Sequence, residues 1–162
     1  MSAVRLAEAI EADLIQLAAG HLQWYFSRQL PPGRAAIIFG DLAEVEIRLR
    51  IREADDLPTG GADAYVILRE QRSRRAPDRP SMYWYGLAQR LPTGDWIYEG
   101  FHLHNEPGRG LISHFQSELR EEENGNPRKV AWERVPNIHA VPAVEALMAR
   151  YYARLVEAEP EL

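Results

Sequence analysis

The strongest signal along the chain is a strict alternation of apolar and charged residues over positions 44–52. Successive side chains of a β-strand point to opposite faces, so this alternation predicts a strand with one buried and one solvated face. We expect the apolar residues to be buried and Glu46, Arg48 and Arg50 to be exposed. The apolar positions are Val45, Ile47, Leu49 and Ile51, and the other charged positions are Glu44 and Arg52.

Two amphipathic helices are predicted, one toward each end of the chain. Over residues 3–29, apolar residues recur at steps of three and four, which places them on one helical face. Ser2 can cap the first turn with its hydroxyl, and residues 31–33 (Pro-Pro-Gly) end the helix because proline has no amide hydrogen. A second stripe of this spacing predicts a helix over residues 143–157, after a loop that ends at Pro142.

Further strands joined by short turns are predicted between the helices. Residues 57–60 and 91–94 repeat the tetrapeptide Leu-Pro-Thr-Gly, in which proline presets a turn and glycine accepts a left-handed backbone. Gly40 and Asp41 predict another tight turn. The strands expected besides residues 44–52 are 34–39, 64–71, 82–89 and 96–104.

Residues 110–123 fit two structures, because their apolar residues lie at helical spacing and also at alternate positions. The three glutamates at 121–123 would oppose the dipole of a helix ending there, which favours a strand. In that case residues 124–125 (Asn-Gly) turn the chain into a partner strand over residues 129–135.

Together these elements predict an α+β fold in a single domain over residues 1–162. The strand signals are contiguous over residues 34–135, and their connections have hairpin length, which is typical of an antiparallel sheet. We expect a mostly meandering sheet of five to seven strands, packed by the long N-terminal and C-terminal helices.

The composition excludes several kinds of site. The 162 residues include no cysteine, so disulfides, thiolate zinc sites, iron–sulfur clusters and cysteine nucleophiles are excluded in this chain. No apolar run approaches the roughly 18 residues of a membrane span, and the first residues lack the pattern of a secretory signal. A net charge of −5 disfavours bulk attraction to nucleic acid or anionic lipid. We expect a cytoplasmic protein without membrane association.

Four histidines after residue 100 are the most suggestive residues chemically. His102 and His104 are two positions apart, so in a strand their imidazoles share a face and can chelate a divalent metal. A third ligand would come from His114, His139 or Glu106, whose positions the sequence leaves open. Because convergence needs several independent placements, we expect no bound metal and no cofactor. These residues are the catalytic candidates if the protein is an enzyme.

A register argument predicts a notch in the sheet. If residues 92–94 form a three-residue loop, Trp84 lies opposite His102 and Gly86 lies opposite Gly100. Two glycines side by side leave a gap that can hold a small ring, a partner's side chain or a large side chain from a terminal helix. The residues of this predicted notch are Trp84, Gly86, Tyr98, Gly100 and His102.

A second group of candidate residues is basic. Guanidinium groups suit phosphate pairing, and arginines among aromatic residues on a sheet are typical of single-strand RNA binders. Residues 34–90 contain ten arginines against nine acids, so their combined charge is almost nil and nucleic acid is a disfavoured partner. The candidates for phosphate or RNA contact are Arg48, Arg50, Arg52, Arg69, Arg72, Arg74 and Arg75.

Three functions are compatible with these patterns. The first is a non-enzymatic binding or regulatory protein whose aromatic-rich sheet holds a protein partner or a second copy of the chain. It is favoured because the sheet has more apolar surface than two helices can cover. The alternative is a histidine-based hydrolase or nuclease, with or without a metal, and the third is a single-strand RNA-binding protein. The positions of the histidines separate the first two, and a steep salt dependence of binding would mark the third.

Overall fold

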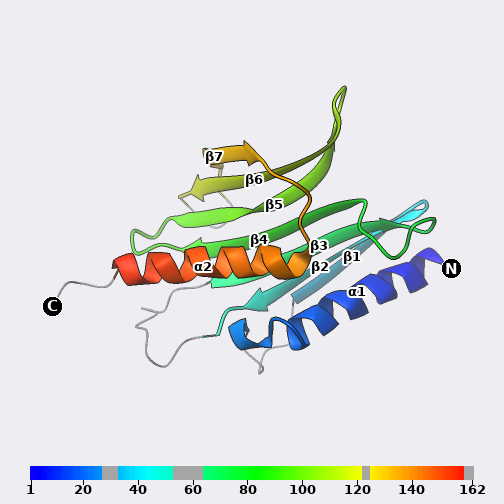
Figure 1. The fold of residues 1–162 in the computed structure, drawn as a ribbon, viewed down its shortest axis with the longest axis horizontal. Helices are drawn as coiled ribbons and strands as arrows, with labels where there is room; N and C mark the ends of the chain where they lie inside the picture. The colour runs from blue at the N-terminus through cyan, green and yellow to red at the C-terminus, as the bar shows by residue number, and fades with distance from the viewer. Residues whose placement is uncertain (27–32, 53–63, 122–124, 159–162) are drawn as a thin grey trace.

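The computed structural model describes residues 1–26, 33–52, 64–121 and 125–158 (Figure 1). Seven strands form one sheet, each hydrogen-bonded to the next along the chain and antiparallel to it, so the α+β meander is confirmed. The elements are α1 (Ala3–Ala19), the 3₁₀ turn η1 (Gln23–Tyr25), β1 (Gly33–Phe39), β2 (Leu42–Arg50), β3 (Ala64–Ser73), β4 (Met82–Arg90), β5 (Trp96–Glu106), β6 (Gly110–Arg120), β7 (Arg128–Arg134) and α2 (Ala140–Ala158).

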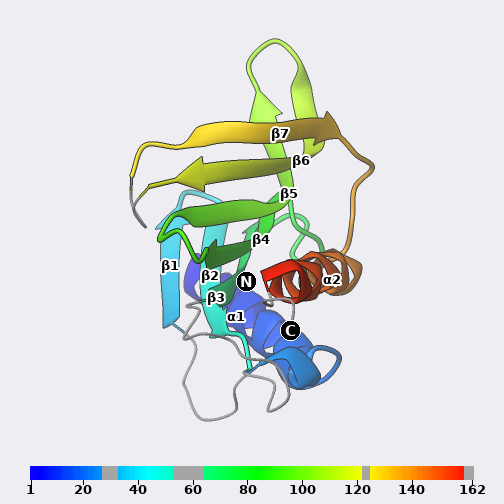
Figure 2. The same cartoon turned by 90° about the vertical axis from the view of Figure 1, so that its left-hand side faces the viewer.

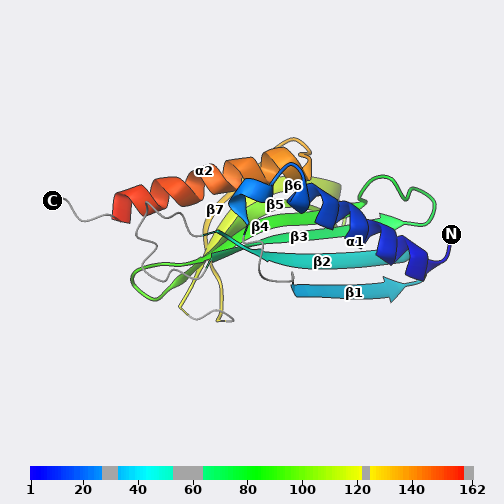
Figure 3. The ribbon, with the colours of Figure 1, turned by 90° about the horizontal axis from the view of Figure 1, so that it is seen from below.

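Both helices lie on the same side of the sheet (Figure 3). α1 packs mainly on β2, and α2 packs on β4 and β5. The sheet twists strongly, so that β1 and β2 run at a steep angle to β6 and β7 (Figure 2). No described helix is both long and apolar enough to cross a membrane. The shared core between the helices and the sheet includes Leu6, Ile10, Leu14, Ile47, Leu68, Leu87, Leu147 and Met148.

The alternation over residues 44–52 forms the predicted half-buried strand. Val45 and Ile47 of β2 are buried, as is Ile51 just beyond it, whereas Arg48 and Arg50 are exposed. The inward side chains meet α1, which explains why one face of this strand is apolar.

Two positions of β2 differ from the expectation. Leu49 is only half-buried. Glu46 is also half-buried rather than exposed, because Arg48 and Arg69 donate to its carboxylate at 3.2 and 2.7 Å. Burial raises the pKa of this carboxyl, but the two guanidinium groups outweigh burial and hold the pKa below its usual value. Glu46 therefore belongs to an ion-pair cluster on the solvated face.

The first helix is shorter than the predicted range of residues 3–29. It ends at Ala19, and Gly20 follows as its C-cap, in keeping with the poor helix propensity of glycine. The apolar stripe continues because Leu22 and Phe26 remain in the core after the chain has left the helix. Burial, not helical geometry, accounts for these two apolar residues.

The last helix begins earlier than predicted. It starts at Ala140, so Pro142 lies in its first turn rather than in a loop. Proline fits there because the first amides of a helix have no intrahelical acceptor and because its fixed φ is helical.

Residues 110–120 are a strand rather than a helix. β6 pairs with β5 and β7, so it is an inner strand of the sheet. Phe115 contacts Phe101 in the core under the helices, whereas His114 lies on the other face. Partners on both faces explain the alternation that the sequence shows.

The loop at residues 92–94 has the predicted form. The amide of Leu91 donates to the carbonyl of Asp95 at 2.7 Å, and Gly94 has a φ of 94°. This loop fixes the register between β4 and β5. The end of the predicted first helix with its proline stop, the turn at residues 57–60 and Asn124 lie outside the described residues.

Arg72 does not belong to a basic surface. It is buried on the helix-covered face, where it bridges Glu70 of its own strand and Asp13 of α1, at 2.7 Å to each carboxylate. The Tyr85 hydroxyl donates to the other oxygen of Glu70, which satisfies this buried carboxylate further. Arg72 therefore attaches α1 to the sheet. Because it is buried, it is not available for contact with phosphate or RNA.

A second buried carboxylate attaches α2. Glu99 of β5 has no solvent exposure and accepts from Arg150 at 2.9 Å and from Arg154 at 2.6 Å. Arg154 also donates to Gln89 of β4 at 2.7 Å. Both helices are thus attached to the sheet by charge-assisted hydrogen bonds in addition to apolar packing.

We predict that Ile47→Ala lowers the free energy of unfolding by about 2–5 kcal/mol, because it removes a buried side chain between β2 and α1. Arg50→Ala, on the exposed face of the same strand, should change it by less than about 0.5 kcal/mol. Urea denaturation of both variants checks this. Equal and small effects would contradict the assignment of the two faces.

Candidate metal centre

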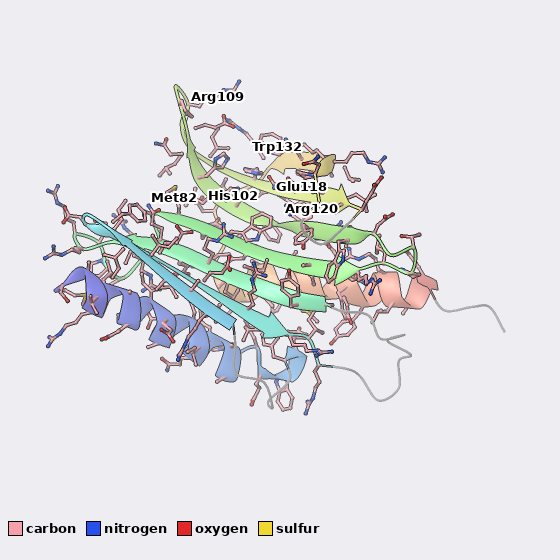
Figure 4. The ribbon with its side chains drawn as sticks, turned by 180° about the vertical axis from the view of Figure 1, so that it is seen from behind. Met82, His102, Arg109, Glu118, Arg120 and Trp132 are labelled. Atoms are coloured by element: carbon pink, nitrogen blue, oxygen red, sulfur yellow. The ribbon has the colours of Figure 1, made fainter. Side chains whose placement is uncertain are left out.

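The face of the sheet opposite the helices carries the candidate centre (Figure 4). Cross-strand pairing places the residues of this open face in rows that run from β2 to β7. One row contains Arg69, Trp84, His102, His114 and Arg134, one residue from each strand from β3 to β7. The meander therefore brings side chains from five segments of the chain onto one line.

Three imidazoles converge on this face. His102 and His104 lie two positions apart on β5, and His114 of β6 is the cross-strand partner of His102. One ring nitrogen of each residue lies within 4.8 Å of the other two. The sequence favoured the absence of a metal because several ligands would have to be brought together independently. The structure brings three of the candidate ligands, His102, His104 and His114, together.

The other two candidate ligands lie elsewhere. His139 precedes α2 and lines a cavity of about 370 Å³ on the helix-covered side, together with Tyr83. Glu106 ends β5 and pairs with Arg109 in the adjoining turn, at 3.6 Å. Neither belongs to the group of converging donors in the described residues.

The tautomer of His114 is set by its neighbours on β6. The amide nitrogen of Gln116 donates to the carboxylate of Glu118 at 3.1 Å, so the amide oxygen must face His114. That oxygen lies 2.8 Å from Nε2 of His114 and can only accept, so Nε2 carries the proton. Arg120 in turn donates to Glu118 at 3.1 Å and completes the chain of contacts.

This arrangement leaves a lone pair on Nδ1 of His114. The residue is 2% exposed, and Nδ1 is buried with no hydrogen-bond partner in the part of the chain that the structure describes. Buried polar atoms are normally paired, so an orphan nitrogen in a cluster of imidazoles calls for a ligand. A histidine that binds a metal through one nitrogen commonly donates the other N–H to such a fixed acceptor.

Two of the imidazoles are held neutral. Burial lowers the pKa of His102 to about 4, and the two other rings and Arg69 act in the same direction. Burial also lowers the pKa of His114, against the opposing effect of its hydrogen bond with Gln116. Neutral imidazole is the form that binds a metal, so these two donors need not lose a proton at neutral pH.

Tryptophans stand on both sides of the imidazoles. The Trp84 ring meets His102 edge-on with centroids 5.4 Å apart, and the Trp132 ring stacks on His114 at 5.0 Å. Figure 4 shows Trp132 and His102 on the same side of the sheet. The two rings pack against His102 and His114 from opposite sides of the cluster and restrict the rotamers of these histidines.

The predicted glycine pair is present, but it does not form an open notch. Gly86 lies opposite Gly100, and Ala88 opposite Tyr98, in the predicted register. The indole of Trp84 lies over both glycines, in the space that a Cβ would take at Gly86. The expected occupant was a ligand or a side chain from a terminal helix, whereas a residue of the same strand fills the gap.

The three nitrogens suit zinc or a similar transition ion. Zn–N bonds of about 2.0–2.1 Å in a tetrahedron require the nitrogens to lie about 3.3 Å apart. The imidazoles would reach this spacing by small rotations from their separation of up to 4.8 Å. Three imidazoles leave a fourth position for water or substrate, as in catalytic zinc sites.

The arginines predicted to contact phosphate do not form one group. Arg48, Arg50 and Arg69 lie on the open face of β2 and β3, and Arg72 lies on the other face. Arg74 donates to the carbonyl oxygen of Met1 at 2.8 Å. The remaining two, Arg52 and Arg75, are exposed outside the strands.

The sequence interpretation missed Gln116 and Trp132, which orient and cover His114. The sequence signal that predicts the position of His114 is the turn around residues 107–109. In this turn Glu106 pairs with Gly110, and the resulting register places His114 opposite His102. Pro107 and Gly108 mark that turn in the sequence.

Comparison of the chain with family models, with curated proteins and with solved structures gives no match. The interpretation of the centre therefore depends on its geometry.

We predict that Gly100→Ala destabilises the protein by about 1–3 kcal/mol, because its Cβ would overlap the main chain of β4 and press on the Trp84 indole. Gly94→Ala should destabilise the protein for another reason. Nothing lies within 4 Å of the added Cβ, and only the positive φ of this position disfavours alanine. Thermal denaturation and near-ultraviolet circular dichroism distinguish them. Gly100→Ala should alter the tryptophan signal and Gly94→Ala should not; an unchanged signal in Gly100→Ala would refute the packing of Trp84.

Proposed function

We propose that the protein binds a divalent transition metal, zinc or a close relative, through His102, His104 and His114 and uses it for hydrolysis. The observation that carries the proposal is the buried Nδ1 of His114, which has no partner in the described residues while Nε2 is fixed as a donor to Gln116. The proposal corresponds to the second of the functions that the sequence leaves open.

The chemistry follows from the ligand set. Three neutral nitrogen ligands leave the full positive charge of the metal to act on a fourth ligand, and a zinc-bound water ionises near pH 7. A metal held by these three residues would supply a nucleophile for hydrolysis at neutral pH. His104 and His102 are half-buried on an uncovered face, so a substrate can approach from solvent.

The polar chain on β6 supports this assignment. Arg120, Glu118 and Gln116 hold one another in sequence, at alternate positions on the same face as His114. A chain of this kind has no role in core packing, but it orients an imidazole ligand and raises its basicity.

We predict that the protein retains one zinc ion per chain after loading and dialysis, as measured by elemental analysis. His102→Ala and His114→Ala should abolish retention, because each removes one of three ligands. His139→Ala is the matched control, since His139 lies on the other side of the sheet, and it should retain zinc. Gln116→Leu should keep the ligands but weaken zinc affinity about 10- to 100-fold.

Two results would contradict this proposal. One is a wild-type protein that retains no zinc, cobalt or nickel. The other is retention by His114→Ala equal to that of the wild type. Circular dichroism of each variant shows that a loss of metal does not come from unfolding.

A second candidate function is binding to another copy of the chain through β1. This strand is at the edge of the sheet, and its side chains Ile37, Ile38 and Phe39 are exposed although they are large and apolar. They point to both faces of the strand, so neither helix can cover all of them. Antiparallel pairing of two β1 edges is self-complementary and would continue the meander across a two-fold axis.

We predict a dimer in light scattering at micromolar concentration and a monomer for Ile37→Lys, which places a charge on the apolar edge strand. Val130→Lys, at an exposed apolar position on the opposite edge strand, is the control and should remain dimeric. A monomeric wild type would contradict this second proposal and would have no bearing on the proposed metal centre.

A further inference from the structure

The last strand of the sheet, β7, has a free edge. It is the outermost strand, on the side of the sheet away from α1, and its neighbour in the sheet is β6 (Figure 1). All seven of its residues are exposed, including the large apolar side chains of Val130 and Trp132, which are 60% and 39% exposed. An edge strand of this kind can accept a further strand, because one side of its backbone has no ladder partner.

The register with β6 shows which backbone groups of β7 face outward. The amide of Val135, just after the strand, donates to the carbonyl of Ser113 at 3.2 Å, so Val135 turns its backbone groups toward β6. In an antiparallel pair, residues with inward and outward backbone groups alternate. Trp132 and Arg134 therefore direct their N–H and C=O groups away from the sheet, where an added strand would pair with them.

The side chains of β7 give this edge a positive charge. Arg128, Lys129 and Arg134 are three cations against one acid, Glu133, so the strand is basic in a chain whose net charge is −5. The charges are divided unevenly between the two faces of the strand. Lys129 and Arg134 lie on the open face, whereas Glu133 lies on the helix-covered face, opposite Phe115.

The neighbouring strand does not neutralise the two cations of the open face. Glu118 of β6 is the cross-strand partner of Lys129, but its carboxylate pairs with Arg120 at 3.1 Å. The cross-strand partner of Arg134 is His114, which carries no negative charge. The open face of β7 is therefore an electropositive edge that an anionic partner would complement.

Two other occupants suit this edge less well. A second copy of the chain would bring the cations of its own β7 against those of the first, and like charges on paired strands are destabilising. The β1 strand of a second copy has no acid to complement them. A nucleic acid would neutralise the cations, but it has no peptide backbone to continue the ladder. A protein strand satisfies both the backbone groups and the charges.

We propose that β7 binds an acidic, extended segment of a partner protein, which adds to the sheet as a further antiparallel strand. Its acidic side chains occupy every second position, because alternate residues of a strand share one face and the cations Lys129 and Arg134 lie on the open face. The intervening residues need not be acidic, since they lie on the face of Glu133. This inference goes beyond the proposed metal function and does not depend on it.

Two labelled peptides with blocked ends test the inference on the full chain. One is Val-Glu-Val-Glu-Val-Glu-Val, and the other has lysine in place of each glutamate. We predict saturable binding of the glutamate peptide in fluorescence anisotropy, with an affinity that falls as salt is raised. The lysine peptide should bind about tenfold more weakly or less, because it replaces attraction by repulsion. No binding of the glutamate peptide, or equal binding of both peptides, overturns the inference.

Methylated peptides distinguish strand addition from simple charge attraction. The glutamates would lie opposite Trp132 and Arg134, so the glutamate amides would donate to β7 and the valine amides would point away from it. N-methylation of the glutamates should abolish binding, whereas N-methylation of the valines, the matched control, should preserve it. Binding that survives methylation of the glutamates overturns strand addition.

Charge reversal on the strand tests the same contact from the side of the protein. Arg134→Glu should weaken binding of the glutamate peptide about tenfold or more and strengthen binding of the lysine peptide, a gain that a misfolded variant would not show. Arg50→Glu is the matched control, because Arg50 is exposed on the open face of β2 and the variant changes the net charge equally. It should keep the wild-type affinity. Equal losses in the two variants, or no loss in Arg134→Glu, overturn the inference.

Hydrogen exchange locates the bound peptide. The amides of Trp132 and Arg134 should become protected, because they donate to peptide carbonyls in the complex. Protection of β1 amides instead overturns the assignment to β7. A single-stranded RNA oligonucleotide of equal charge that binds more tightly than the glutamate peptide assigns the edge to nucleic acid and also overturns it. These experiments need no metal, so their outcome is independent of the metal proposal.

Discussion

The register of β4, β5 and β6 is the constraint on which the candidate centre depends. Two short turns set it, one that ends at Gly94 and one that contains Gly108, and both glycines have positive φ. A slip of one residue in either turn would send a whole strand's side chains to the opposite face. His114 would then lie beneath the helices, and its partners on β6 would move with it. The geometry of two turns therefore decides whether three imidazoles meet.

The two faces of the sheet have different roles. The helix-covered face contains the continuous core and the carboxylates of Glu70 and Glu99, which attach α1 and α2. This anchoring leaves the other face free of helices, so its residues need not form a core. Trp84, lying over the glycine pair, and Trp132 provide local packing there instead. A rigid scaffold on one side thus supports three oriented imidazoles on the other, of which His102 and His104 are half-buried and His114 is buried.

The sequence predicts the architecture well because short-range signals determine it. Alternation identified β2, and the loop at residues 92–94 gave the pairing of Trp84 with His102. Helix ends were harder to predict, since Leu22 and Phe26 keep the apolar pattern after α1 has ended. The site was predicted only in part: His102 and His104 share a face by spacing alone, but the position of His114 depends on a second turn and on the choice of strand for β6. A single sequence gives only a weak signal for long-range strand pairing of this kind.

Anomalous diffraction at the zinc edge from crystals grown with one equivalent of zinc tests the central claim most directly. The account predicts a single strong peak at about 2.0–2.1 Å from one nitrogen each of His102, His104 and His114, with Nδ1 as the ligand atom of His114. It also predicts that Nε2 of His114 still donates to Gln116. A peak elsewhere on the protein, or coordination of His114 through Nε2, would contradict the account.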